Sequence, residues 1–122
     1  MRQLGDLEAE IMDRLWSWGR PATAREVLND LNRTRPLAYS TVKTVADILC
    51  GKGMLSREMD GRTWSYRATC TRQEYTASRM REALEGSQDT AGVMASFVEK
   101  ISPGEAEALR AALRAAKRRQ GS

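Results

Sequence analysis

Residues Leu37–Arg67 read LAYSTVKTVADILCGKGMLSREMDGRTWSYR, and within this segment a helical pattern changes to a strand pattern. Apolar residues first recur at helical spacing, at Val42, Val45, Ala46 and Leu49. After Gly53 the period falls to two, in two limbs that meet at Asp60-Gly61, a dipeptide typical of tight hairpin turns. The stretch therefore predicts a helix followed by a β-hairpin.

The predicted helix has a polar face that is free of core residues. Ser40 is expected to cap its first turn, and Gly53 to supply the left-handed residue that ends it. Off the apolar stripe lie Thr41, Lys43, Thr44 and Asp47. On the hairpin, Trp64 and Tyr66 are expected to pack on the helices, and the side chains expected on the exposed ribbon are Arg57, Arg62 and Arg67. Such a helix and hairpin suit a phosphate backbone.

Two further helices are expected before this stretch. Apolar residues at helical spacing predict the first over Leu4–Trp18, closed by Gly19 and Pro21. Thr23 and Glu26 form a capping box for the second, whose buried residues are expected to be Val27, Leu28 and Leu31. Three helices followed by a hairpin is the order of a winged helix-turn-helix, which we predict for residues 1–70.

Residues 71–122 are predicted to add three helices with narrow apolar stripes. Capping boxes open the first at Thr71 and the last at Ser102, and the middle helix runs from about Asp89 to Ile101. Isolated helices gain most of their stability from packing, so these are expected to pair with a second copy of the chain, although folding back on the winged helix as a monomer is an alternative. The expected dimerisation residues are Tyr75, Met80, Leu84, Val93, Met94, Phe97, Val98, Ile101, Leu109 and Leu113.

The positive charge is concentrated around the predicted helix and hairpin. The whole chain of 122 residues carries +4, and residues 1–32 hold four arginines against six acidic residues. Residues 33–67 hold seven basic and three acidic residues, a balance of +4. A solvated charged face is the plain interpretation of any one arginine, but the cluster favours nucleic acid.

Other classes of function are disfavoured by composition. The chain has no histidine and no phosphate-cradling glycine motif, which argues against an enzyme, a metal centre or a cofactor. Two cysteines without an export signal do not make a disulfide framework, and Cys50 is expected to be a packed side chain. With neither a signal peptide nor an apolar run long enough to span a membrane, the protein is expected to be cytoplasmic and not inserted in a membrane.

Several segments resemble the penicillinase-repressor (BlaI/MecI/CopY) family of bacterial transcriptional repressors. They are LAYSTVKTV, the helix exit Lys52-Gly53-Met54-Leu55, the hairpin REMDGRTWSYR, the opening LGDLEAEIMDRLW and the late segment ASFVEKISPGEAEALRAAL. The resemblance implies a homodimeric repressor that binds a dyad operator in double-stranded DNA and controls β-lactamase or related antibiotic-resistance or stress genes.

The resemblance also implies release from DNA when a zinc protease linked to a membrane sensor leads to cleavage of the dimerisation region. Where the family has Asn-Phe, this chain has Ser96-Phe97, and Phe97 is also expected in the dimer core. Two positions that are basic in many relatives are Ile48 and Gly51 here, and the cysteine-rich tail of the copper-responsive branch is absent from this sequence.

Residues facing outward by helical spacing coincide with those that the resemblance implies for DNA contact. Thr41, Lys43 and Thr44 are expected to approach base edges, while the arginines contact phosphates or the minor groove. The expected DNA-binding residues are Arg33, Arg35, Ser40, Thr41, Lys43, Thr44, Arg57 and Arg62. The alternative is a winged-helix module that binds proteins and not DNA.

Overall fold

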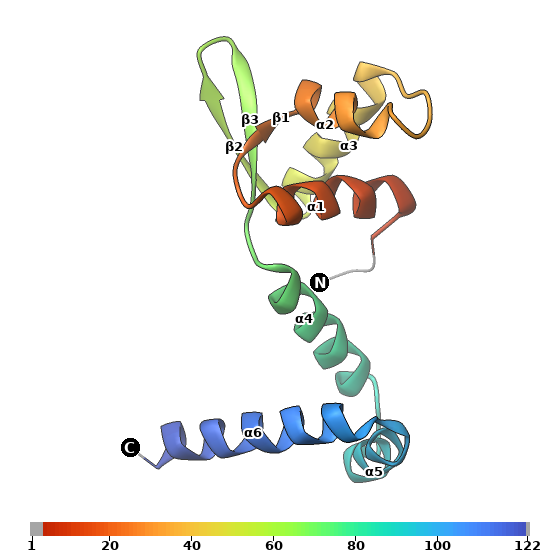
Figure 1. The fold of residues 1–122 in the computed structure, drawn as a ribbon, viewed down its shortest axis with the longest axis vertical. Helices are drawn as coiled ribbons and strands as arrows, with labels where there is room; N and C mark the ends of the chain where they lie inside the picture. Colours follow the sequence, from red (N-terminus) through yellow and green to blue (C-terminus); the bar gives the residue numbers. More distant parts are fainter. Residues whose placement is uncertain (1–3, 122) are drawn as a thin grey trace. The chain divides into compact units, whose positions relative to one another are not determined.

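The computed structural model describes residues 4–121, which form helices and one small sheet (Figure 1). The elements in chain order are α1 (Asp6–Trp18), β1 (Ala22–Thr23), α2 (Ala24–Leu31), α3 (Tyr39–Gly51), β2 (Leu55–Asp60), β3 (Thr63–Ala68), α4 (Arg72–Glu85), α5 (Thr90–Lys100) and α6 (Pro103–Gln120). Contacts divide the chain into two compact units, Met1–Met80 and Arg81–Ser122. The mainly helical winged-helix fold predicted from the sequence is confirmed.

The first unit has one hydrophobic core, built by α1, α2, α3 and the sheet. The predicted stripe of α3 is largely confirmed, since Val42, Ala46 and Leu49 are buried and Val45 is half-buried. The helix α1 begins at Asp6 and not at Leu4. The remaining buried residues are Ile11, Met12, Leu15, Ala22, Ala24, Val27, Leu28, Leu31, Met54, Leu55 and Tyr66.

The two ends of α3 differ in how well the sequence predicted them. Ser40 is not the N-cap: Ala38 holds that position in an extended conformation, and its carbonyl accepts hydrogen bonds from Thr41 (3.1 Å) and Val42 (3.3 Å). Ser40 is therefore the second residue of α3, and its side chain is exposed to solvent. At the other end Gly53 has φ +80°, and Met54 donates its N–H to the carbonyl of Leu49 (2.9 Å). This confirms the left-handed ending predicted at Gly53.

The predicted hairpin is confirmed, but its turn lies one residue further on. Asp60 pairs with Thr63 as the last residue of β2, which leaves Gly61 and Arg62 as the two-residue loop. Gly61 has φ +69° and Arg62 does not have a positive φ, the pattern of a type II′ turn. The β2–β3 hairpin is the wing of this fold, and its tip therefore carries a basic residue, Arg62. Figure 1 shows this end of the hairpin extending beyond α1–α3.

A third strand, β1, was not predicted. Its two residues pair with β3, Ala22 opposite Tyr66 and Thr23 opposite Ser65, so β3 is the central strand. Two residues are too few to show a period of two. Thr23 then caps α2 by accepting the N–H of Glu26 (3.1 Å), as predicted.

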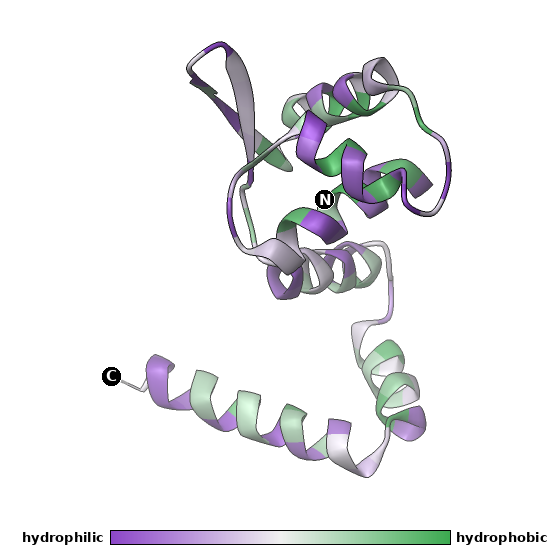
Figure 2. Cartoon of the chain, turned by 45° about the horizontal axis from the view of Figure 1, so that its top comes forward, coloured by the Kyte–Doolittle hydropathy of each residue, from purple (hydrophilic) through white to green (hydrophobic). Residues whose placement is uncertain are grey.

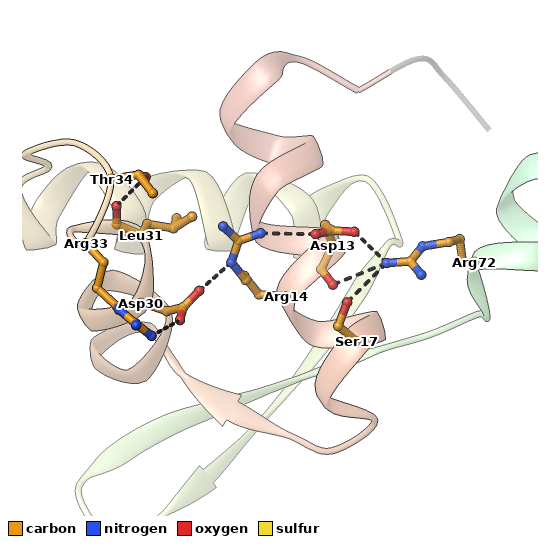
Figure 3. Close-up of polar contacts among 8 residues, drawn as sticks. All are labelled: Asp13, Arg14, Ser17, Asp30, Leu31, Arg33, Thr34 and Arg72. Carbon is orange, nitrogen blue, oxygen red and sulfur yellow. Dashed lines mark hydrogen bonds and ion pairs between the residues drawn. The ribbon is translucent and has the colours of Figure 1, made fainter.

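The start of α4 packs on the first unit through a polar and aromatic contact with α1. The indole N–H of Trp16 donates to the carbonyl of Cys70 (2.9 Å), and the Trp16 and Tyr75 rings are 5.5 Å apart. Arg72 donates to Asp13 (2.5 Å) and to the hydroxyl of Ser17 (3.3 Å), as Figure 3 shows. The first turns of α4 are thus held by the winged helix.

Side-chain caps begin the three helices of the C-terminal part, at or near the positions predicted from the sequence. Thr71 accepts the N–H of Glu74 (3.0 Å), Asp89 accepts that of Gly92 (3.0 Å) and Ser102 that of Glu105 (3.1 Å). No described residue of α4, α5 or α6 is fully buried. In the described part of the chain no helix combines the length and apolar character needed to cross a membrane.

Candidate nucleic-acid interface

The outward face of α3 carries hydroxyl groups. Ser40, Thr41 and Thr44 are exposed, on the side of the helix opposite to its buried stripe. Ile48 continues this surface towards the C-terminal end and is 47% exposed. Hydroxyls donate and accept hydrogen bonds, so this face can contact both base edges and phosphates.

Asp47 lies on the same outward face of α3, and its carboxylate accepts hydrogen bonds from three side chains. Lys43 Nζ lies 2.7 Å from Oδ2, and Arg57 Nη1 lies 2.9 Å from Oδ1. The hydroxyl of Tyr66 donates to Oδ1 at 2.7 Å. The cluster joins α3 to both strands of the hairpin, and two cations expected to contact DNA share this single carboxylate.

The electrostatics of this cluster favour the charged forms of the ion pair. Burial pushes the pKa of Asp47 upward, but hydrogen bonds from Lys43 and Tyr66 outweigh it and hold the pKa below its usual value. The hydrogen bond to Asp47 raises the pKa of Lys43. Burial, and then the hydrogen bond to Asp47, raise the pKa of Tyr66. At neutral pH the cluster therefore holds one anion, two cations and a neutral phenol.

The wing presents its free charge at the turn. Arg62 is exposed and makes no ion pair or hydrogen bond within residues 4–121. Arg57 instead stacks its guanidinium over the Trp64 ring at 4.2 Å, in addition to its pair with Asp47. Tyr66 is only 2% exposed and packs in the core, as expected, whereas Trp64 is half-buried.

The two arginines of the loop before α3 are both paired, but unequally. Arg35 Nη2 lies 2.6 Å from Glu10 on α1. Arg33 lies 3.7 Å from Asp30, and its side chain is 80% exposed. Figure 3 shows Asp30 between Arg33 and Arg14, whose guanidinium takes the closer position at 2.5 Å. Arg33 is therefore the more accessible of the two loop arginines.

A contact that sequence reasoning missed lies between the first turns of α2 and α3. The guanidinium of Arg25 stands 4.5 Å from the ring centroid of Tyr39, which immediately precedes Ser40. Both side chains are exposed. Arg25 belongs to the acidic segment 1–32, so the charge count did not select it. The signal that could have indicated this contact is Tyr39 itself, an aromatic residue at the start of α3 that does not belong to the apolar stripe of that helix.

Neither cysteine shows the features of a reactive thiol. Cys50 and Cys70 form no disulfide bond and are partly buried, and burial raises the pKa of each. Neither is a thiolate at neutral pH. Among residues 4–121 no cluster of three or more acidic, cysteine or histidine side chains could hold a metal ion.

The expected dimerisation residues lie mostly on open surfaces. Phe97 is 50% exposed, and Figure 2 shows hydrophobic residues over most of α5 and at intervals along α6. The other large apolar residues exposed in this region are Met80, Val93, Met94, Val98, Leu109 and Leu113. Tyr75 lies instead against Trp16 in the first unit, while Leu84 and Ile101 are half-exposed. Ser96 is exposed beside Phe97 on α5.

Comparison with known proteins gives consistent matches. A sequence profile of the family described as penicillinase repressor matches residues 4–115. Transcriptional regulator BlaI of Mycobacterium tuberculosis (strain CDC 1551 / Oshkosh) is 40% identical over 116 residues, which make up 93% of this chain and 84% of that protein.

Two solved structures of repressor DNA-binding domains resemble the winged helix. The solution structure of the DNA-binding domain of the repressor BlaI has a TM-score of 0.51 at 27% identity, over 60% of this chain and 88% of that one. The monomeric form of Bacillus licheniformis BlaI in complex with the blaP half-operator has a TM-score of 0.50 at 27% identity, over 61% of this chain and 89% of that one.

Proposed function

This chain belongs to the penicillinase repressor family of transcriptional regulators, and from that premise we propose that it represses transcription as a homodimer bound to a dyad operator. The family consists of repressors without enzymatic activity, which confirms the expectation that the chain is not an enzyme.

The observation that carries the proposal is the exposed hydroxyl-bearing face of α3 beside a basic wing. Ser40, Thr41 and Thr44 point to solvent, and Arg62 stands unpaired at the wing tip within the described chain. A helix of this kind fits the major groove, where base edges are distinguishable, and the arginine fits a phosphate or the minor groove. Bacillus licheniformis BlaI forms a complex with a half-operator as a monomer, so we assign one half-site to each winged helix of this protein.

Secondary DNA contacts come from side chains that the fold already holds in place. Lys43 and Arg57 reach DNA while tied to Asp47, and Arg33 and Arg35 contact phosphates from the loop before α3. The arginine contacts fix the register of the protein on DNA, while Lys43 and the hydroxyl face choose the sequence.

Dimerisation is assigned to residues 71–122. Apolar side chains as exposed as Phe97 rarely stay in water when they gather on one surface, and a second copy of the chain covers them with the same surface. Two linked winged helices gain from effective concentration, so a dimer binds two half-sites far more tightly than a monomer binds one.

Release from DNA is assigned to proteolysis within α5. Ser96 and Phe97 are both exposed in the single chain, among the apolar residues proposed for the dimer contact. Cleavage there divides the dimerisation region and lowers dimer affinity. The proposed agent is a zinc protease linked to a membrane sensor, the proposed targets are β-lactamase or related resistance genes, and the proposed location is the cytoplasm.

The test begins with selection of duplexes from a random pool by the full chain. The expected consensus is two-fold symmetric, and binding to it exceeds binding to a scrambled duplex at both 50 and 200 mM salt. Sedimentation of the same sample shows a dimer. If no duplex is enriched and binding does not depend on salt, the chain is instead a winged-helix module that binds proteins.

A further inference from the structure

Asp47 is an acidic residue in the middle of the surface proposed to face DNA. It follows Thr44 by three positions and Ser40 by seven, a spacing that places all three on one face of α3. A carboxylate on this face is repelled by phosphates. Its presence therefore requires an explanation beyond general solvation.

The carboxylate acts on two cations at once. Lys43 reaches it from the same helix (2.7 Å) and Arg57 from β2 (2.9 Å), so one negative charge is set against two positive charges. Tyr66, anchored in the core, fixes the carboxylate from β3 through its hydroxyl (2.7 Å). The two ion pairs alone are sufficient to keep the anion beside both cations, and the hydroxyl of Tyr66 adds a third contact.

We propose that Asp47 is a specificity-determining residue, which lowers affinity for non-operator DNA by offsetting the charge of Lys43 and Arg57. This inference rests on the proposed DNA-binding function. Non-operator binding comes almost wholly from the release of counterions by cations that meet phosphates. At the operator the major groove brings base amino groups within reach of Asp47, and a carboxylate accepts hydrogen bonds from such groups, which offsets its repulsion from phosphates. On non-operator DNA, which is held by phosphate contacts alone, the repulsion is not offset, so the fixed anion lowers that affinity by a larger factor.

The variant that tests this is Asp47→Asn, which removes the charge and keeps the size. On a scrambled duplex, affinity rises roughly threefold to tenfold at 0.1 M salt, and the plot of log affinity against log salt steepens by about 0.9, the value of one phosphate contact. Operator affinity rises less, so the ratio of operator to scrambled binding falls. Asp47→Ala, which also removes the charge and suits a helix, steepens the slope by the same amount.

Two controls separate charge from structure. Asp6→Asn makes the same change of charge at the first position of α1, an exposed site outside α3, and leaves the slope unchanged. Tyr66→Phe removes one hydrogen bond to Asp47 without a change of charge, and also leaves the slope unchanged.

The outcomes are distinct. An unchanged slope for Asp47→Asn and Asp47→Ala, with a wild-type chain that prefers its operator, overturns the inference alone. A slope that steepens as much in Tyr66→Phe overturns it too, because the effect then comes from the hydrogen bond and not from charge. A wild-type chain that shows no salt-dependent binding overturns the proposed function and this inference together.

Discussion

Arg62→Ala should remove one complete phosphate contact, because Arg62 carries charge that nothing in the described chain offsets. It occupies the second position of the two-residue turn between β2 and β3, where its side chain is exposed. The substitution does not remove a residue with positive φ, since only Gly61 in this turn has one. The wing should therefore keep its shape and lose only its terminal charge.

The magnitude follows from counterion release. One phosphate contact contributes about 0.9 to the slope of log affinity against log salt, so the slope for Arg62→Ala should be shallower by about 0.9. Between 50 and 200 mM salt, the affinity advantage of the wild-type protein over the variant should shrink by a factor of about 3.5. The loss should be the same on operator and on scrambled duplexes, because a phosphate contact does not read sequence.

Fluorescence anisotropy of labelled duplexes across a salt series measures this slope directly. Arg81→Ala is the matched control, because Arg81 pairs with Glu85 on α4 (3.2 Å) and has no proposed DNA contact. Its slope should equal that of the wild-type protein. A slope for Arg62→Ala equal to the wild-type value would refute the placement of the wing tip on the phosphate backbone. A loss confined to the operator would show instead that Arg62 reads bases.

Three further predictions concern the helix, the dimer and the core. Lys43→Ala should cost about 1–3 kcal/mol on the operator and less on scrambled DNA, measured by the same titrations, and an equal loss on both would exclude a base-reading role. Phe97→Asp places a charge on an apolar surface of α5, so sedimentation at micromolar concentration should find monomers, and a persistent dimer would contradict the assignment of this surface. Leu49→Ala removes a fully buried side chain of α3 and should lower the free energy of unfolding by about 2–5 kcal/mol in urea denaturation, whereas a change below 1 kcal/mol would show that the site is not part of the core.

Local patterns explain why so much of the fold could be predicted from the sequence. The stripe of α3, the capping boxes at Thr23 and Ser102 and the left-handed Gly53 each depend on residues within a few positions of one another. The N-cap of α3 was predicted two residues too late, at Ser40, because Ala38 in an extended conformation can begin the helix without a side-chain cap. The strand β1 was missed because its pairing with β3 joins residues more than forty positions apart.

The charge of the candidate site was harder to predict than its location. The sequence placed seven basic residues between positions 33 and 67, and the described chain pairs five of them with carboxylates, as Arg33, Arg35, Lys43, Lys52 and Arg57. A count along the chain does not show which acids lie nearby, since Glu8 and Glu10 reach these cations from α1. Of these seven basic residues, only Arg62 and Arg67 have no carboxylate partner within residues 4–121.

The same limitation applies to Asp47 and to Arg25. The pair of Asp47 with Lys43 is an i,i+4 contact within α3, which spacing along the chain does indicate. Arg57 and Tyr66, however, reach Asp47 from β2 and β3, ten and nineteen residues away. The stacking of Arg25 on Tyr39 joins two helices. Contacts between different helices and strands depend on how the core packs these elements together, and the spacing of residues along the sequence does not predict them.

This chain is proposed to read DNA through a two-fold symmetric pair of winged helices. A footprint of the full chain across the genome that encodes it measures the symmetry of its binding sites. The expected protected sites have two-fold symmetry, with half-sites separated by whole helical turns, or about 10 base pairs each. Protection of single, non-symmetric half-sites, or no protection above that of random sequence, would contradict this proposal.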